Sequence, residues 1–127
     1  MKLPSWTVPI FFFNILFAAV TRYNNITMKQ PKIEIPKAAI ADFCKKNHIR
    51  MLALFGSVLR DDFTSESDID VLVEFETGFT PGWGFIRMER ELSEILGHRV
   101  DLNTIGFLSP YIVDDVIKEA EVMYVAA

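Results

Sequence analysis

Two short apolar runs joined by a polar loop constrain the fold of this chain more than any other feature. The first run, residues 50–55, leads directly into Gly56-Ser57, and the second, residues 70–75, begins at Asp70 with Asp68 just before it. Each run has the length and composition of a β-strand, so the sequence predicts two strands joined by a turn and a loop. Strand residues alternate between the two faces of a sheet, and Asp68 and Asp70 are therefore expected to project on the same side.

The residues of this stretch can bind phosphate and metal. Two neighbouring carboxylates repel each other, and a divalent cation such as Mg²⁺, which prefers oxygen ligands and shares them with substrate phosphates, removes the repulsion. The N–H groups and hydroxyl of Gly56-Ser57 form a cradle for an anion, because glycine lets the backbone approach a ligand closely. The alternative is structural: Ser67 caps the loop, the two aspartates lie on the surface, and Gly-Ser is an ordinary turn. Each motif alone is weak, whereas the two in this order favour nucleotide chemistry.

Gly56-Ser57, ten further residues and Asp68-Ile69-Asp70 resemble the signature of the DNA polymerase β-like nucleotidyltransferases. The resemblance is closest to the minimal nucleotidyltransferases (MNT), small proteins encoded beside HEPN-domain toxins. It covers about residues 33–125 and includes the segments 96–102 and 117–124. It implies an α/β fold, in which a small mixed β-sheet is flanked by helices.

The resemblance also implies roles for residues outside the signature. Asp101, inside a short apolar strand, matches the third catalytic carboxylate and would lie across the sheet from Asp68 and Asp70. Arg60 matches an arginine three residues after the serine, and its guanidinium could meet triphosphate oxygens. The alternative is a solvated arginine, or one paired with a neighbouring aspartate. Asp61 stands where the family usually has glycine, which adds a negative charge beside the expected phosphates.

The implied activity is nucleotidyl transfer with ATP as the donor. Ser57 and nearby N–H groups, including that of Gly56, would hold the β- and γ-phosphates, and Ser67 would lie against the nucleotide. The three aspartates would bind two Mg²⁺ ions around the α-phosphate, with Asp101 also activating the acceptor hydroxyl. Attack at the α-phosphorus would release pyrophosphate.

The acceptor follows only from the resemblance. MNT proteins are antitoxins that attach AMP to a tyrosine of a partner HEPN ribonuclease toxin, so the same role is expected here. A second possibility is a binding antitoxin that masks the toxin while its chemistry is vestigial. A third is AMP transfer to a small molecule such as an aminoglycoside, although such enzymes usually carry a further domain to hold the drug.

Length and charge narrow the range of functions. The chain has 127 residues, enough for one domain, and we place it at residues 28–127. The formal net charge of −4 argues against a long nucleic-acid track, which needs clustered Lys and Arg. Cys44 is the single cysteine, which rules out an internal disulfide and agrees with a reducing, cytoplasmic location.

Residues 1–27 differ from the rest, because residues 6–20 are mostly apolar. They could be a signal peptide, or a membrane anchor that is short of the roughly 20 apolar residues a span needs. We favour a mis-assigned start, with the true one at Met28, where the part resembling the family begins. Membrane association is expected only if the segment is made.

Deleting residues 1–27 is therefore expected to leave a soluble, stable domain. Size-exclusion chromatography and thermal unfolding of the truncated and full chains measure this. An insoluble truncation beside a soluble full chain would contradict the mis-assigned start.

The remaining elements follow from periodicity and capping. A helix is expected from Pro36 to Lys46 and another from residues 85–96, stopped by Gly97. A short strand at residues 99–103 and a closing strand at residues 122–125 complete the sheet. A last helix between these strands is expected to begin at Ser109-Pro110, with serine as its N-cap and proline at its first position.

Overall fold

The computed structural model describes residues 30–127, so the expectations for residues 1–27 lie outside the described part of the chain. The strands are β1 (Ile49–Phe55), β2 (Ile69–Phe75), β3 (Val100–Asn103) and β4 (Glu121–Val125). The helices are α2 (Lys37–Lys46), α3 (Gly84–Leu96) and α4 (Val113–Glu119), with the short 3₁₀ helices η1 (Gly56–Leu59) and η2 (Ile105–Phe107). No helix within residues 30–127 is both long and apolar enough to cross a membrane.

The four strands form one sheet in the order β3-β2-β1-β4. β1 pairs antiparallel with β2 and β4, whereas β2 and β3 are parallel and are connected through α3. A parallel pair needs such a crossover, since a tight turn can join only antiparallel strands. The predicted small mixed sheet with flanking helices is confirmed.

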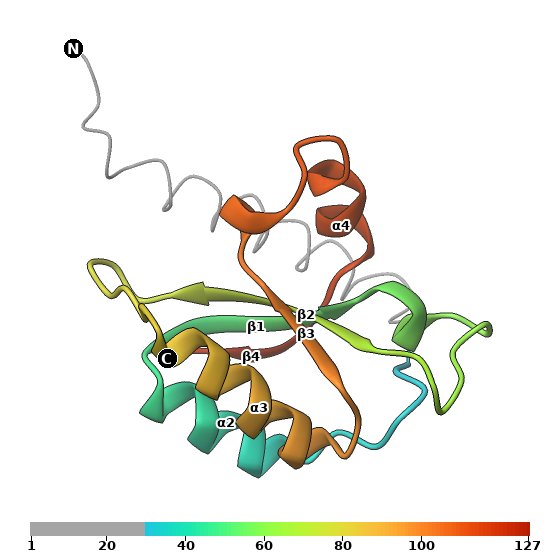
Figure 1. The fold of residues 1–127 in the computed structure, drawn as a ribbon, viewed down its shortest axis with the longest axis horizontal. Helices are drawn as coiled ribbons and strands as arrows, with labels where there is room; N and C mark the ends of the chain where they lie inside the picture. The colour runs from blue at the N-terminus through green and yellow to red at the C-terminus, as the bar shows by residue number, and fades with distance from the viewer. Residues whose placement is uncertain (1–29) are drawn as a thin grey trace.

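The two faces of the sheet have different covers (Figure 1). Helices α2 and α3 lie together on one face, where Leu52, Leu54 and Val71 belong to the larger apolar core. Helix α4 lies on the other face, over a smaller core that includes Ala53 and Leu72. Because strand residues alternate, the even-numbered β2 residues Asp70 and Leu72 share the α4 face.

Helix α3 is amphipathic and ends as the sequence predicts. Its buried residues Met88, Leu92 and Leu96 recur at four-residue spacing, so they form one stripe against the core. Gly97 follows in the left-handed conformation with φ of 69°, and its N–H donates to the Ser93 carbonyl at 2.9 Å. Glycine adopts this conformation without the steric cost of a Cβ atom, which explains the sharp end of the helix.

The predicted start of the last helix is wrong by three residues, since Pro110 was expected at its first position and α4 begins at Val113. Ser109 accepts hydrogen bonds in a turn, from the Ile112 N–H at its carbonyl (3.0 Å) and from the Tyr111 N–H at its Oγ (3.4 Å), and α4 begins at Val113. Serine followed by proline suits the first two positions of a β-turn as well as a helix start, and the sequence pattern does not separate the two.

Candidate active site

The Gly56 turn lies directly against the carboxylate of Asp70. Phe55, the last residue of β1, pairs with Asp70 near the start of β2, so the chain enters η1 beside this aspartate. Gly56 has φ of +76°, and a Cβ atom at this position would stand only 2.2 Å from Asp70 Oδ2. Glycine is therefore needed twice, for its backbone conformation and for the close approach of the backbone to a carboxylate.

Asp70 lies among other carboxylates on the α4 side of the sheet. Asp101 of β3 is its direct partner in the parallel register and is exposed on an edge strand, while Asp68 immediately precedes β2. Partial burial raises the pKa of Asp70 to about 6, and the negative charges of Asp101 and Asp68 add to the rise while Arg60 opposes it. The fold thus places Asp68 and Asp101 within electrostatic range of Asp70, and a bound cation would favour the fully ionised form of the three carboxylates.

Asp68 is held by Arg99, which comes just before β3. The Arg99 Nε donates to Asp68 Oδ1 at 2.6 Å, and the Arg99 carbonyl accepts from the Ile69 N–H at 2.8 Å. Within residues 30–127, no three His, Cys, Asp or Glu side chains stand ready to hold a metal ion. The oxygens of Asp70 and Asp101 suit a hard cation such as Mg²⁺. Asp68 would join them as a ligand once its ion pair with Arg99 is broken.

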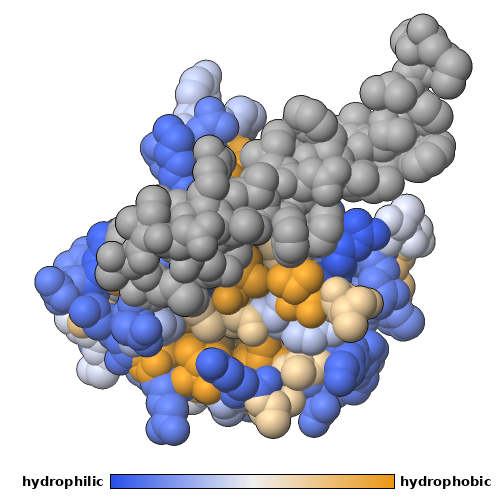
Figure 2. All heavy atoms as spheres, turned by 180° about the vertical axis from the view of Figure 1, so that it is seen from behind, coloured by the Kyte–Doolittle hydropathy of each residue, from blue (hydrophilic) through white to orange (hydrophobic). Residues whose placement is uncertain are grey.

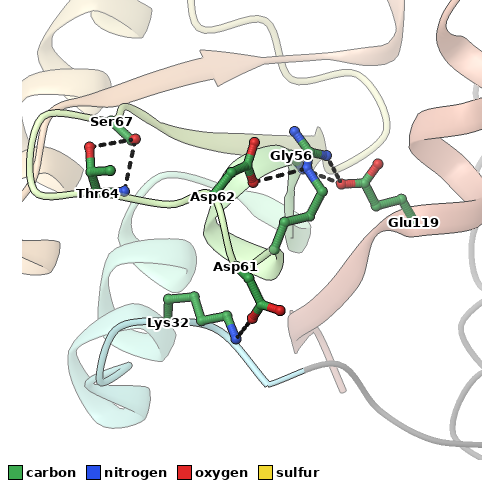
Figure 3. Close-up of polar contacts among 8 residues, drawn as sticks. Lys32, Gly56, Asp61, Asp62, Thr64, Ser67 and Glu119 are labelled. Atoms are coloured by element: carbon green, nitrogen blue, oxygen red, sulfur yellow. Dashed lines mark hydrogen bonds and ion pairs between the residues drawn. The ribbon is translucent and has the colours of Figure 1, made fainter.

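The carboxylate of Glu119, at the end of α4, contacts the turn at Gly56 and the side chain of Arg60. Glu119 Oε1 accepts from the Gly56 N–H at 2.8 Å and from Arg60 Nη1 at 2.9 Å, and in Figure 3 it reaches across toward Gly56. Asp62 also contacts Arg60, at 3.4 Å from Nε. Arg60 is therefore paired in this structure, partly as the alternative interpretation expected, and its contact with phosphate stays a prediction.

The loop between η1 and β2 is shaped by local contacts (Figure 3). Ser67 Oγ accepts from the Thr64 N–H at 3.0 Å, so Ser67 caps the loop as the structural alternative proposed, and its contact with a nucleotide stays a prediction. Asp61 is exposed and pairs with Lys32 Nζ at 2.8 Å, which lowers the pKa of Asp61 through the hydrogen bond and the charge of the lysine. This pairing draws the unusual aspartate of the loop toward Lys32.

Sequence reasoning gave no role to Glu119 or Arg99, although both lie in segments that carried the family resemblance. A signal was available for Glu119, because it ends α4, where the helix dipole disfavours a negative charge and a carboxylate needs a donor. Glu74 was missed too: burial raises its pKa to about 7. It lies four residues along β2 from Asp70, about 13 Å away, so it stands outside the cluster.

The sequence profile of the nucleotidyltransferase domain family matches residues 37–123. A relative from Methanocaldococcus jannaschii that bears the name of a protein adenylyltransferase is 34% identical over 84 residues, covering 66% of this chain and 89% of its own length. The protein adenylyltransferase MntA of Thermococcus cleftensis is 38% identical over 77 residues, covering 61% of this chain and 75% of its own length.

Solved structures agree on the fold. A minimal nucleotidyltransferase structure that is 34% identical aligns with a TM-score of 0.55 over 66% of this chain and 85% of its own. The crystal structure of a toxin–antitoxin with AMP-PNP aligns with a TM-score of 0.59 at 19% identity, over 72% of this chain and 75% of that one. The chain therefore belongs to the nucleotidyltransferase domain family and is a nucleotidyltransferase of the minimal type.

Proposed function

We propose that this protein is an antitoxin that transfers AMP from ATP to a tyrosine of a partner HEPN ribonuclease toxin, in a reaction that depends on Mg²⁺. One observation carries the chemical part of the proposal: the Gly56 backbone packs on Asp70, and Asp101 lies beside Asp70 in register. An anion cradle and a carboxylate pair in contact are the two parts that transfer of a nucleotidyl group needs.

In the proposed reaction, the Gly56-Ser57 turn and Arg60 bind the β- and γ-phosphates of ATP. Asp68, Asp70 and Asp101 would hold two Mg²⁺ ions, which stabilise the charge of the entering and leaving oxygens. The Asp101 carboxylate accepts the proton of the tyrosine hydroxyl as its oxygen bonds to the α-phosphorus. The bond between the α-phosphorus and the bridging oxygen breaks, and pyrophosphate leaves.

The relatives support a protein acceptor. Two of them, 34% and 38% identical to this chain, are named as protein adenylyltransferases, and the second is an MntA protein. Among the described residues, several large apolar side chains are exposed and available for contact with a protein partner. They are Trp83, Ile86, Phe107, Tyr111, Ile112 and Val125. On the face opposite that of Figure 1, hydrophobic areas lie between hydrophilic ones (Figure 2).

The test mixes the purified full chain, Mg²⁺, ATP labelled on the α-phosphate and the HEPN protein encoded by the neighbouring gene. Label is expected on a tyrosine of the HEPN protein, located by mass spectrometry, and its ribonuclease activity is expected to fall. Asp68→Asn should abolish labelling, because it removes a charge from the carboxylate cluster. Asp42→Asn, an exposed change on α2 at the other face of the sheet, is the matched control and should label normally.

Two other results would redirect the proposal. A stable complex that silences the HEPN protein without label would indicate a binding antitoxin with vestigial chemistry. The absence of a neighbouring HEPN gene, together with transfer to an added aminoglycoside, would indicate a transferase for small molecules.

A further inference from the structure

Glu119 occupies the anion-binding position of the turn. A single carboxylate oxygen, Oε1, accepts from the backbone N–H of Gly56 at 2.8 Å and from the guanidinium of Arg60 at 2.9 Å. A backbone amide and an arginine that converge on one anionic oxygen are the donors that a phosphate oxygen uses. These are also two of the donors that the proposed function gives to the triphosphate.

The same donors cannot serve Glu119 and a phosphate at once. The Gly56 N–H is one donor with one hydrogen, so a phosphate oxygen reaches it only when Glu119 leaves. The Arg60 Nη1 group is held by the same carboxylate oxygen, so a phosphate that uses these two donors displaces Glu119 from both. Glu119 and the triphosphate must therefore exchange.

The position of Glu119 makes this exchange feasible. Its side chain is 24% exposed, so the carboxylate can rotate into water without crossing the core. It ends α4, where the unpaired carbonyls of the helix disfavour its charge. Its charge also reaches Asp70, where it contributes to the raised pKa of that carboxyl, so it stands close to the centre of the proposed reaction.

We propose that Glu119 is an internal competitor for the triphosphate and thereby limits the affinity of this enzyme for ATP. The proposal rests on the proposed function of the Gly56-Ser57 turn. It makes Glu119 a determinant of nucleotide affinity rather than a catalytic residue. Removal of its charge should therefore strengthen nucleotide binding, whereas loss of a residue that merely holds Arg60 in place should weaken it.

The experiment compares the full chain with Glu119→Gln by isothermal titration calorimetry, using α,β-methylene ATP with Mg²⁺, a donor that cannot be cleaved. The glutamine side chain of the variant keeps an oxygen that can accept the same hydrogen bonds but has no charge. We expect the dissociation constant to fall by about three- to tenfold, as for the loss of one partly screened charge beside the triphosphate. AMP lacks the β- and γ-phosphates, so its affinity should rise much less in the Glu119→Gln variant.

Two further variants separate this effect from general ones. Asp115→Asn removes one exposed charge from the same helix and should leave affinity unchanged. Glu119→Asp keeps the charge on a shorter side chain and should not reach the affinity of Glu119→Gln; it also serves as the folded comparison if Glu119→Gln unfolds. Unchanged or weaker binding by folded Glu119→Gln overturns the proposal while leaving the nucleotide site intact. Absence of binding by every variant, wild type included, overturns both the proposal and the proposed function.

Discussion

Asp70→Asn is expected to lower nucleotidyl transfer at least about a thousandfold, which corresponds to about 4 kcal/mol of transition-state stabilisation. Asp70 is the carboxylate that the other parts of the site surround: Gly56 packs on it, Asp101 pairs with it in register, and Asp68 acts on it electrostatically. Asparagine keeps the shape of the side chain but halves the charge that the pair of Asp70 and Asp101 can offer to a cation. The measurement is labelling of the acceptor protein by α-labelled ATP at saturating Mg²⁺.

The same change should leave the fold intact or strengthen it. The pKa of Asp70 is raised to about 6 in the folded protein, so the native state binds its proton more tightly than the unfolded chain does. Ionised Asp70 therefore destabilises the fold. The free energy of unfolding falls for this reason as the pH rises from about 4 to about 6. At pH 7.5 without Mg²⁺, the variant should gain about 1 kcal/mol after allowance for solvent screening.

Thermal unfolding across pH 4–8 measures this gain, and it should disappear toward pH 4, where wild-type Asp70 is protonated. Asp42→Asn, on the opposite side of the sheet, should change neither activity nor the pH profile. A well-folded Asp70→Asn protein that labels the acceptor at the wild-type rate would remove Asp70 from the metal-binding set.

The strands and the carboxylates could be predicted because local patterns determine them. The run of residues 70–75 is continuous enough to be a strand, and alternation then places Asp70 on a defined face. The observed strand β2, Ile69–Phe75, differs from this by one residue. Predicting the position of Asp101 required the family resemblance. The sequence alone does not show that β3 pairs in parallel with β2, nor does it give the register of that pairing.

The ion pairs of the site could not be predicted, because they join segments that are far apart in the chain. Glu119 meets Gly56 only because α4 packs on the face of the sheet that carries Asp70. Which face a helix covers is determined by packing between distant segments, not by the local sequence. Arg99 meets Asp68 through the same parallel pairing that places Asp101. The start of α4 was missed for a local reason, since Ser109-Pro110 is compatible with both a turn and a helix.

Gly56→Ala is expected to reduce activity at least about a hundredfold and to cost about 2–4 kcal/mol of stability. Two effects add. Alanine at φ of +76° carries a backbone penalty of about 1–2 kcal/mol, and its methyl group would stand 2.2 Å from Asp70 Oδ2, so the carboxylate or the turn must move. Either movement separates the anion cradle from Asp70. Chemical denaturation and the AMP-labelling assay measure the two losses.

Gly78 offers a matched control for the backbone effect. Its φ is +84°, and a Cβ atom there would have no heavy atom within 4 Å, so Gly78→Ala should show the backbone penalty alone and keep activity. The contact with Asp70 can be isolated by introducing Gly56→Ala into an Asp70→Ala protein, where the carboxylate is gone. The stability cost of Gly56→Ala should then fall to about that of Gly78→Ala. An equal cost in both backgrounds would show that the contact with Asp70 does not explain the requirement for glycine, and that the turn depends on its backbone conformation alone.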